Sequence, residues 1–161
     1  MKPADPTLVF GLGQAYMKDG QTQAAIAEFE KVLARDSRDA AVNVNIARCY
    51  LALDDPGRAY QFARRAVEID PKMFAAHRVM GRALALQDRT AEAVAELEKA
   101  VPSDRDGSVH YQIFLAYRKL QQPAKAEAAL QRSRELRARN RLWNPDEEQA
   151  SAVTDTLSID K

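Results

Sequence analysis

The residues with the clearest chemical potential lie close together between positions 103 and 110. Ser103, Ser108 and His110 supply two hydroxyls and an imidazole, and Asp106 supplies a carboxylate. These are the residue types of a catalytic nucleophile and its base. Such a nucleophile is usually set on a strand-to-helix turn with backbone donors for an oxyanion, and the surrounding sequence has neither pattern. We therefore expect that the chain is not an enzyme.

Metal and cofactor sites have equally little support in the sequence. The run from Asp104 to Ser108 has the oxygen-bearing side chains of a calcium loop, but its glycine and closing glutamate do not fall at the required positions. A single cysteine, Cys49, excludes both paired zinc-binding cysteines and an intramolecular disulfide. The sequence contains no glycine-rich phosphate loop. We therefore expect no metal and no cofactor.

The composition fits one folded domain without strong electrostatic attraction to other molecules. Of 161 residues, 46% are hydrophobic and 29% are charged, which allows a hydrophobic core. A net charge of +1 provides no long-range attraction to nucleic acid or to an anionic membrane. No long apolar run follows the first residues, so we expect neither a signal peptide nor a membrane span. These features favour a cytoplasmic location.

Corresponding residue types recur along the chain with a period of 34 residues. A fourth unit follows the first three but begins one residue early, so we expect a shorter connection near residues 104–107. Equivalent positions are Leu12, Ile46, Met80 and Ile113; Gly13, Ala47 and Gly81; Tyr16, Tyr50, Leu84 and Tyr117; and Ala25, Ala59, Ala93 and Ala126. Such regular spacing indicates an array of structural repeats.

Within each unit the apolar residues recur at spacings of three and four, which predicts amphipathic helices rather than strands. Turn-forming residues divide each unit into two helices of about a dozen residues, and Pro56 and Pro123 suit the first turn of a helix. The expected turns are at 18–20, 54–56, 87–89 and 121–123. The chain is therefore predicted to be all-α and built from helical hairpins.

This pattern of small residues at fixed points among large apolar ones resembles the tetratricopeptide repeat family. Ser37 and Phe114 depart from the family pattern, and no unit has its early tryptophan. The resemblance implies a right-handed α-solenoid of about four antiparallel helical hairpins. The expected organisation is an N-terminal lead at 1–5, repeat units at 6–39, 40–73, 74–106 and 107–140, and a flexible tail at 141–161.

Several packing contacts follow from the repeat. We expect the small residues of the first helices to face those of the second, with Gly81 against Ala93, for example. His77 and His110 fall at equivalent points, where the family often has a bulky ring, and are expected to be packing residues. The last helix should bury Ala126, Leu130, Ser133 and Leu136 and serve as a cap.

The two ends of the chain leave alternatives open. Apolar residues Leu8, Val9, Phe10 and Leu12 lie on several sides of the first helix, which suggests a fragment of a longer array with a structural assembly role. At the other end, docking of Leu142 and Trp143 on the last hairpin is an alternative to a flexible tail.

In the tetratricopeptide family the first helices line a concave face, so their outward residues become candidate partner-binding residues. Basic groups dominate this set and no acidic group occurs in it, which favours an acidic segment or a terminal carboxylate of a protein or peptide partner. The candidates are Gln14, Lys18, Asn45, Arg48, Arg78, Arg82, Tyr111, Gln112, Arg118 and Lys119.

The basic residues of the groove and of the last helix allow three other interpretations. The groove arginines could be ordinary solvated residues paired with acids such as Asp39 or Glu68. Family members that bind chaperone tails clamp a carboxylate with lysine and asparagine, and only Asn45 matches that set, so such tails are not expected ligands. A nucleic-acid accessory role for the basic residues of the last helix is the alternative function. We expect no specific nucleic-acid binding and no membrane insertion. The basic residues of the last helix are Arg132, Arg134, Arg137, Arg139 and Arg141, interleaved with Glu135.

Overall fold

The computed structural model describes residues 5–142, which form eight α-helices and one short 3-10 helix and contain no strand. The prediction of an all-α chain is therefore confirmed for this range, and the predicted docking of Trp143 lies outside it. The last helix continues to Leu142, two residues past the predicted end of the repeats. The elements are α1 (Pro6–Lys18), α2 (Thr22–Leu33), α3 (Ala40–Ala52), α4 (Pro56–Ile69), α5 (Phe74–Leu86), α6 (Thr90–Ala100), η1 (Val101–Ser103), α7 (Ser108–Lys119) and α8 (Pro123–Leu142).

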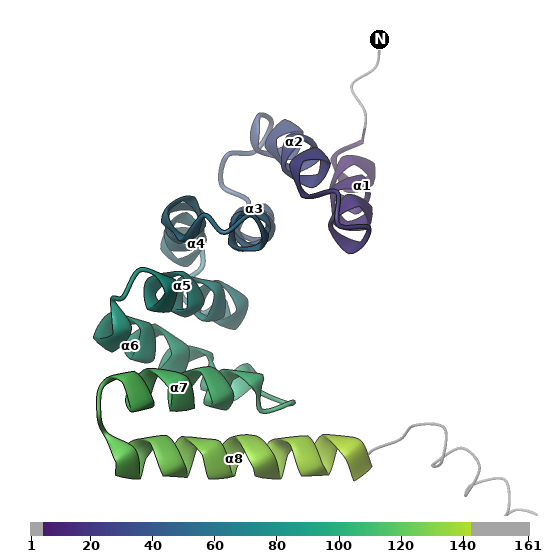
Figure 1. Cartoon of the computed structure of the whole chain (residues 1–161). Coiled ribbons are helices and arrows are strands. Elements are labelled where there is room, and N and C mark those ends of the chain that lie inside the picture. Colours follow the sequence, from purple (N-terminus) through teal and green to yellow (C-terminus); the bar gives the residue numbers. More distant parts are fainter. Residues whose placement is uncertain (1–4, 143–161) are drawn as a thin grey trace, which may run out of the picture.

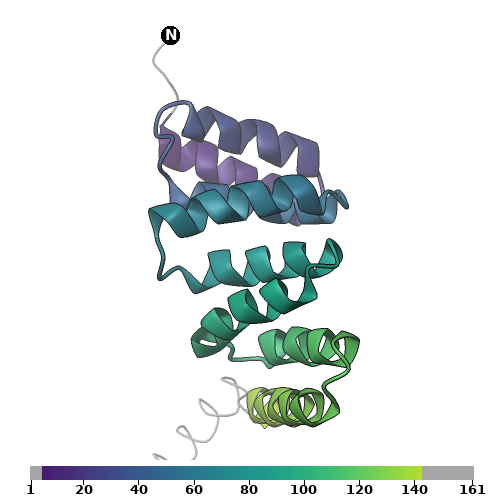
Figure 2. The ribbon, with the colours of Figure 1, turned by 90° about the vertical axis from the view of Figure 1, so that its left-hand side faces the viewer.

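The helices pair into four antiparallel hairpins that stack into an open arc, from α1–α2 to α7–α8 (Figures 1 and 2). In Figure 1, α1, α3 and α5 lie on the inner side of the arc, and α2, α4 and α6 lie on its outer side. The first helices also pack against one another, α1 on α3, α3 on α5 and α5 on α7. The structure is thus a helical solenoid whose inner side is built from first helices.

Each hairpin turn contains one residue in the left-handed backbone conformation, although only the first of them is glycine. The four positions are Gly20 (φ 73°), Asp54 (φ 56°), Asp88 (φ 62°) and Gln121 (φ 55°). In every turn the N–H of the next residue donates to a carbonyl in the last turn of the preceding helix, at N···O distances of 2.9–3.0 Å. This bond satisfies a carbonyl that the end of the helix would leave without a partner. The turns follow the spacing of the sequence repeat.

Glycines allow the two helices of a hairpin to approach closely. A Cβ added to Gly81 of α5 would lie 2.7 Å from Cγ of Leu97 and 3.1 Å from the carbonyl oxygen of Ala93 on α6. A Cβ on Gly13 would lie 2.6 Å from the ring of Phe29. Gly81 therefore meets Ala93 as expected, but the side chain against each glycine is a large residue one helical turn farther along. This size matching fixes the distance between the paired helices.

The two ends of the described solenoid differ in how they cover apolar groups. Helix α8 buries Ala126, Ser133 and Leu136 and half-buries Leu130, so the predicted capping face is confirmed. At the other end, Leu8 of α1 is 71% exposed. None of the helices within residues 5–142 combines the length and apolar character needed to cross a membrane.

Candidate protein-binding groove

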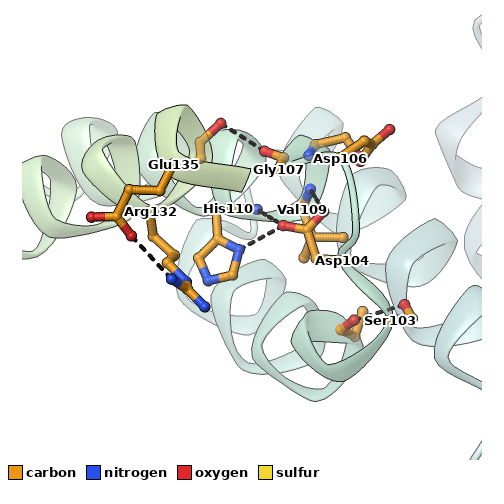
Figure 3. A network of polar contacts seen from close by, with 11 residues as sticks. Ser103, Asp104, Asp106, Gly107, Val109, His110, Arg132 and Glu135 are labelled. Atoms are coloured by element: carbon orange, nitrogen blue, oxygen red, sulfur yellow. Dashed lines mark hydrogen bonds and ion pairs between the residues drawn. The ribbon is translucent and has the colours of Figure 1, made fainter. Parts of the chain in front are cut away.

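The segment with catalytic residue types forms a helix cap in the structure. The buried carboxylate of Asp104 accepts hydrogen bonds from the backbone N–H groups of Val109 and His110 at 3.2 and 3.0 Å, and its Oδ2 lies 2.5 Å from His110 Nδ1 (Figure 3). The Ser103 hydroxyl donates to the Ala100 carbonyl at 2.8 Å. Asp104 therefore holds the start of α7, as an N-terminal cap does, and Ser103 satisfies a carbonyl at the end of α6.

The same connection also joins the two helices of the last hairpin. Gly107 has a φ of 74°, and its carbonyl accepts the Ser133 hydroxyl of α8 at 2.7 Å. A Cβ at Gly107 would lie 2.4 Å from the Ser133 carbonyl oxygen, so the turn and α8 are in direct backbone contact. The contact lies in the connection that the repeat spacing predicted to be shorter, and no residue type at Gly107 or Ser133 indicated it beforehand.

His77 is a packing residue, as predicted from its place in the repeat. It is 4% exposed, with Nδ1 2.7 Å from Glu96 Oε2 and Nε2 2.9 Å from the Pro71 carbonyl oxygen. Burial raises the pKa of Glu96, but hydrogen bonds from Lys99 and His77 outweigh it, so that this pKa lies below its ordinary value. The histidine and the glutamate thus join α5 to α6.

Other candidates for chemistry are also accounted for within residues 5–142. Burial raises the pKa of the Cys49 thiol to about 11, so the side chain is a neutral thiol at physiological pH and a weak nucleophile. No group of three or more histidine, cysteine or acidic residues in this part of the chain is placed to hold a metal ion.

The inner side of the solenoid contains a hollow of about 360 Å³ that three arginines share. Arg48 comes from α3, and Arg78 and Arg82 come from α5. We call it the arginine hollow. Its other lining residues are Leu51, Ala52, Val79 and Gln112.

The arginine hollow has an excess of positive charge. Burial and the charge of Arg78 both lower the pKa of Arg48, and the nearest hydrogen-bonding partner of the Arg48 guanidinium is the neutral Asn45 amide, at 3.4 Å. Among the residues that the structure describes, no carboxylate forms an ion pair with any of the three arginines. Arg48 and Arg78 are half-buried and Arg82 is exposed, and a guanidinium that has lost part of its hydration is stabilised by a nearby anion. The hollow is therefore suited to an anionic group.

The acids considered as partners for these arginines are engaged elsewhere. Asp39 caps α3 by accepting the N–H of Val42 at 2.9 Å, and Glu68 forms an ion pair with Arg64 at 3.2 Å. The interpretation of the groove arginines as residues paired with these two acids is therefore wrong.

A second hollow of about 400 Å³ adjoins the first and is mainly apolar. Its exposed rim includes Leu86 of α5 and Leu115 of α7, which are 50% and 46% exposed. We call it the leucine hollow. It shares Arg82 and Gln112 with the arginine hollow, and the rest of its lining is Ala85, Thr90, Leu97, Ala116 and Lys119. The two hollows together form one groove across α3, α5 and α7.

The structure brings together only part of the predicted site. Arg48, Arg78, Arg82 and Gln112 line the arginine hollow, and Lys119 lines the leucine hollow, where it also forms an ion pair with Asp88. Both Gln14 and Lys18 are exposed on α1 and line neither hollow.

Three other predicted residues make contacts within the solenoid. Asn45 is only 6% exposed, and its Oδ1 accepts a hydrogen bond from the Arg48 guanidinium, so the buried asparagine helps to orient this arginine. The rings of Tyr111 and Phe114 pack at 5.7 Å, and Arg118 lies over the Phe114 ring at 5.6 Å. Neither Tyr111 nor Arg118 lines the two hollows.

Two residues of the apolar half of the groove, Leu86 and Leu97, were not among the residues predicted to face it. Leu86 and Leu97 are leucines at helical positions that are indistinguishable from core positions in the sequence alone. The available signal for an apolar hollow was the position of Leu86, an apolar residue in the last turn of a first helix.

The basic residues of α8 are partly engaged by neighbouring side chains. Arg132 forms an ion pair with Glu135 at 3.0 Å, and Arg137 lies 5.0 Å from the centre of the Tyr111 ring.

Stacked hairpins with a groove on the inner side define a helical-repeat scaffold. Two family models described as tetratricopeptide repeat match residues 10–74 and 51–116, together about two thirds of the chain. The chain therefore belongs to the tetratricopeptide repeat family. This family is a non-enzymatic type of scaffold for protein–protein interaction, which sets the general class of function.

Solved structures support the fold. A structure of MamA MSR-1 is 23% identical, with a TM-score of 0.70 over 84% of this chain and 79% of that chain. A crystal structure of MamA is 19% identical, with a TM-score of 0.77 over 88% of this chain and 84% of that one. A MamA RS-1 double mutant is 19% identical, with a TM-score of 0.75 over 84% and 77%. No curated protein matches the sequence.

Proposed function

We propose that this chain is a scaffold that binds an acidic segment of a partner protein in the groove across α3, α5 and α7. The observation that carries the proposal is the arginine hollow, in which Arg48, Arg78 and Arg82 surround one space and have no carboxylate partner among the described residues. An acidic side chain or a terminal carboxylate would supply the missing negative charge.

The chemistry of arginine supports a carboxylate ligand. The guanidinium presents its N–H donors in a planar fork that fits the two oxygens of a carboxylate, and such charge-assisted bonds are stronger than neutral ones. All three arginines project from packed helices, so their backbones are fixed relative to one another before a ligand arrives, which reduces the entropy that binding would cost. Because the net charge of the whole chain is only +1, the electrostatic attraction would be local to this groove.

A charge-reversal titration tests the proposal. A fluorescein-labelled peptide of three glutamates flanked by Gly-Ser would be titrated with the intact chain and with Arg78→Glu, and binding followed by fluorescence anisotropy. A charged hydrogen bond contributes about 1.5–3 kcal/mol, so we expect Arg78→Glu to weaken binding by about ten- to a hundredfold. Circular dichroism should show unchanged helicity.

The matched control is Arg134→Glu, which makes the same charge change at an exposed position of α8 outside the groove. This variant should bind the peptide as the unmodified chain does. Equal losses in the two variants would indicate non-specific charge attraction and contradict the proposal, as would an unchanged affinity in Arg78→Glu.

A further inference from the structure

The two halves of the groove differ in chemistry, and this difference defines the partner more closely. Building on the proposed function, we propose that the groove selects an extended peptide in which an acidic side chain and a bulky apolar side chain lie three positions apart. The acidic side chain would occupy the arginine hollow and the apolar side chain the leucine hollow.

The leucine hollow is suited to an apolar side chain. Leu86 and Leu115 leave about half of their surface exposed, and Ala85, Leu97 and Ala116 continue the apolar lining between them. Lys119, the cation at this end, is paired with Asp88. Covering these leucines with an apolar ligand removes apolar surface from water, which is favourable.

The helix packing sets the distance between the two hollows. The arginine hollow lies mainly over α3 and α5, and the leucine hollow lies over α5 and α7. Because these first helices pack side by side, the two hollows are separated by about one interhelical spacing, roughly 8–10 Å.

This spacing matches a particular backbone conformation of the ligand. In a polyproline II segment, with three residues per turn and a rise of about 3.1 Å, residues i and i+3 lie on the same side about 9 Å apart. In a β-strand, residues on the same side are two positions and about 7 Å apart, which is too short. An acidic and an apolar residue three positions apart therefore fit the groove best.

Gln112 provides a polar contact at the junction of the two hollows. It lines both, and its Oε1 is buried without a hydrogen-bonding partner among the described residues. A glutamine amide can both donate and accept, so a rotation of this side chain that exposes Oε1 would let it pair with the peptide backbone between the two anchoring side chains. A polyproline II segment leaves its backbone groups free for such a bond.

The test uses short labelled peptides with a fixed backbone. The probe contains Asp-Pro-Pro-Leu between Gly-Ser flanks, and a second probe contains Leu-Pro-Pro-Asp, because either chain direction is consistent with the groove. The comparison peptides contain Asp-Pro-Leu or Leu-Pro-Asp, with the shorter spacing, and Asp-Pro-Pro-Ser or Ser-Pro-Pro-Asp, without the apolar group. We expect the intact chain to bind one of the two probes at least tenfold more tightly than its comparison peptides, as measured by anisotropy.

A variant of the leucine hollow separates this inference from the function on which it rests. Leu115→Gln should remove the preference for the probe while keeping the weaker binding of the triglutamate peptide. The control Leu8→Gln, at an exposed leucine of α1 outside the groove, should leave both unchanged.

Each alternative result is informative. Binding of acidic peptides without dependence on spacing, or a preference that persists in Leu115→Gln, would overturn this inference and leave the proposed function in place. An equal loss in Leu8→Gln would also overturn it. Failure of every acidic peptide to bind would refute the proposed function itself.

Discussion

Replacing Gly81 with alanine tests how tightly α5 and α6 are packed. In a helix interior, glycine to alanine normally stabilises by about 1 kcal/mol, because alanine has the higher helix propensity. At Gly81 the new Cβ would lie 2.7 Å from Leu97 Cγ and 3.1 Å from the backbone oxygen of Ala93. Leu97 is fully buried and a backbone oxygen cannot rotate away, so we expect an overpacking cost of about 1–3 kcal/mol.

Gly11→Ala is the matched control. Gly11 also lies within a helix, but an added Cβ there would meet nothing within 4 Å. The gain in helix propensity is common to both variants, so the difference between their free energies of unfolding isolates the overpacking cost. Urea denaturation followed by circular dichroism at 222 nm measures both. We expect Gly81→Ala to be about 1–3 kcal/mol less stable than Gly11→Ala.

Equal stability of the two alanine variants would refute this reasoning. It would mean that α5 and α6 can separate at no cost, and that small residues at the repeat positions do not determine the spacing of the helices. A crystal structure of Gly81→Ala with an unmoved Leu97 side chain would have the same implication.

Two further predictions concern a turn and a buried ion pair. Gln121→Gly should raise the free energy of unfolding, measured in urea, by about 0.5–1 kcal/mol. A left-handed conformation costs a non-glycine residue about 1–2 kcal/mol, and the greater freedom of glycine in the unfolded chain offsets only part of this gain. A loss of stability in this variant would contradict the prediction. Glu96→Gln tests the lowered pKa of Glu96. The ionised carboxylate stabilises the fold above its ordinary pKa of 4.5 and this contribution is lost as pH falls through the lower folded value. The difference in free energy of unfolding between the unmodified chain and Glu96→Gln should therefore be largest near pH 7 and should decrease below pH 4.5. A difference that does not depend on pH would show that the ionised Glu96 carboxylate does not stabilise the fold.

Much of the fold could be predicted because its determinants repeat locally in the sequence. Small residues such as Gly13 and Gly81 recur in the sequence with the same period as the hairpins in the structure. The spacing of apolar residues by three and four, which predicts a helix, can be read within a short stretch of sequence. The left-handed turn position Gln121 carries neither glycine nor one of the short polar residues that favour this conformation, so its conformation follows from the helices that it joins and could not be recognised from residue type.

The residues of the candidate site could be predicted where the position of a residue along its helix alone decides which way its side chain points. Arg48, Arg78 and Arg82 lie in the same hollow because equivalent faces of α3 and α5 are adjacent. Other side chains contact a neighbour on the same helix instead of facing the groove, and helix register does not show which of the two a side chain will do. Asn45 supports an arginine from below, and Arg118 stacks on Phe114 instead of lining the groove. The cap role of Asp39 was readable from its place directly before α3.

The stacking of hairpins on their immediate neighbours also has a dynamic consequence. An end hairpin can unfold without disrupting the packing of the others, whereas the middle hairpins lose their helices only after a neighbour has been removed. Amide hydrogens of α1 should therefore exchange with solvent earlier than those of α3 and α5, which carry the groove arginines. The groove proposed to bind the partner should thus remain folded while α1 and α2 open and close.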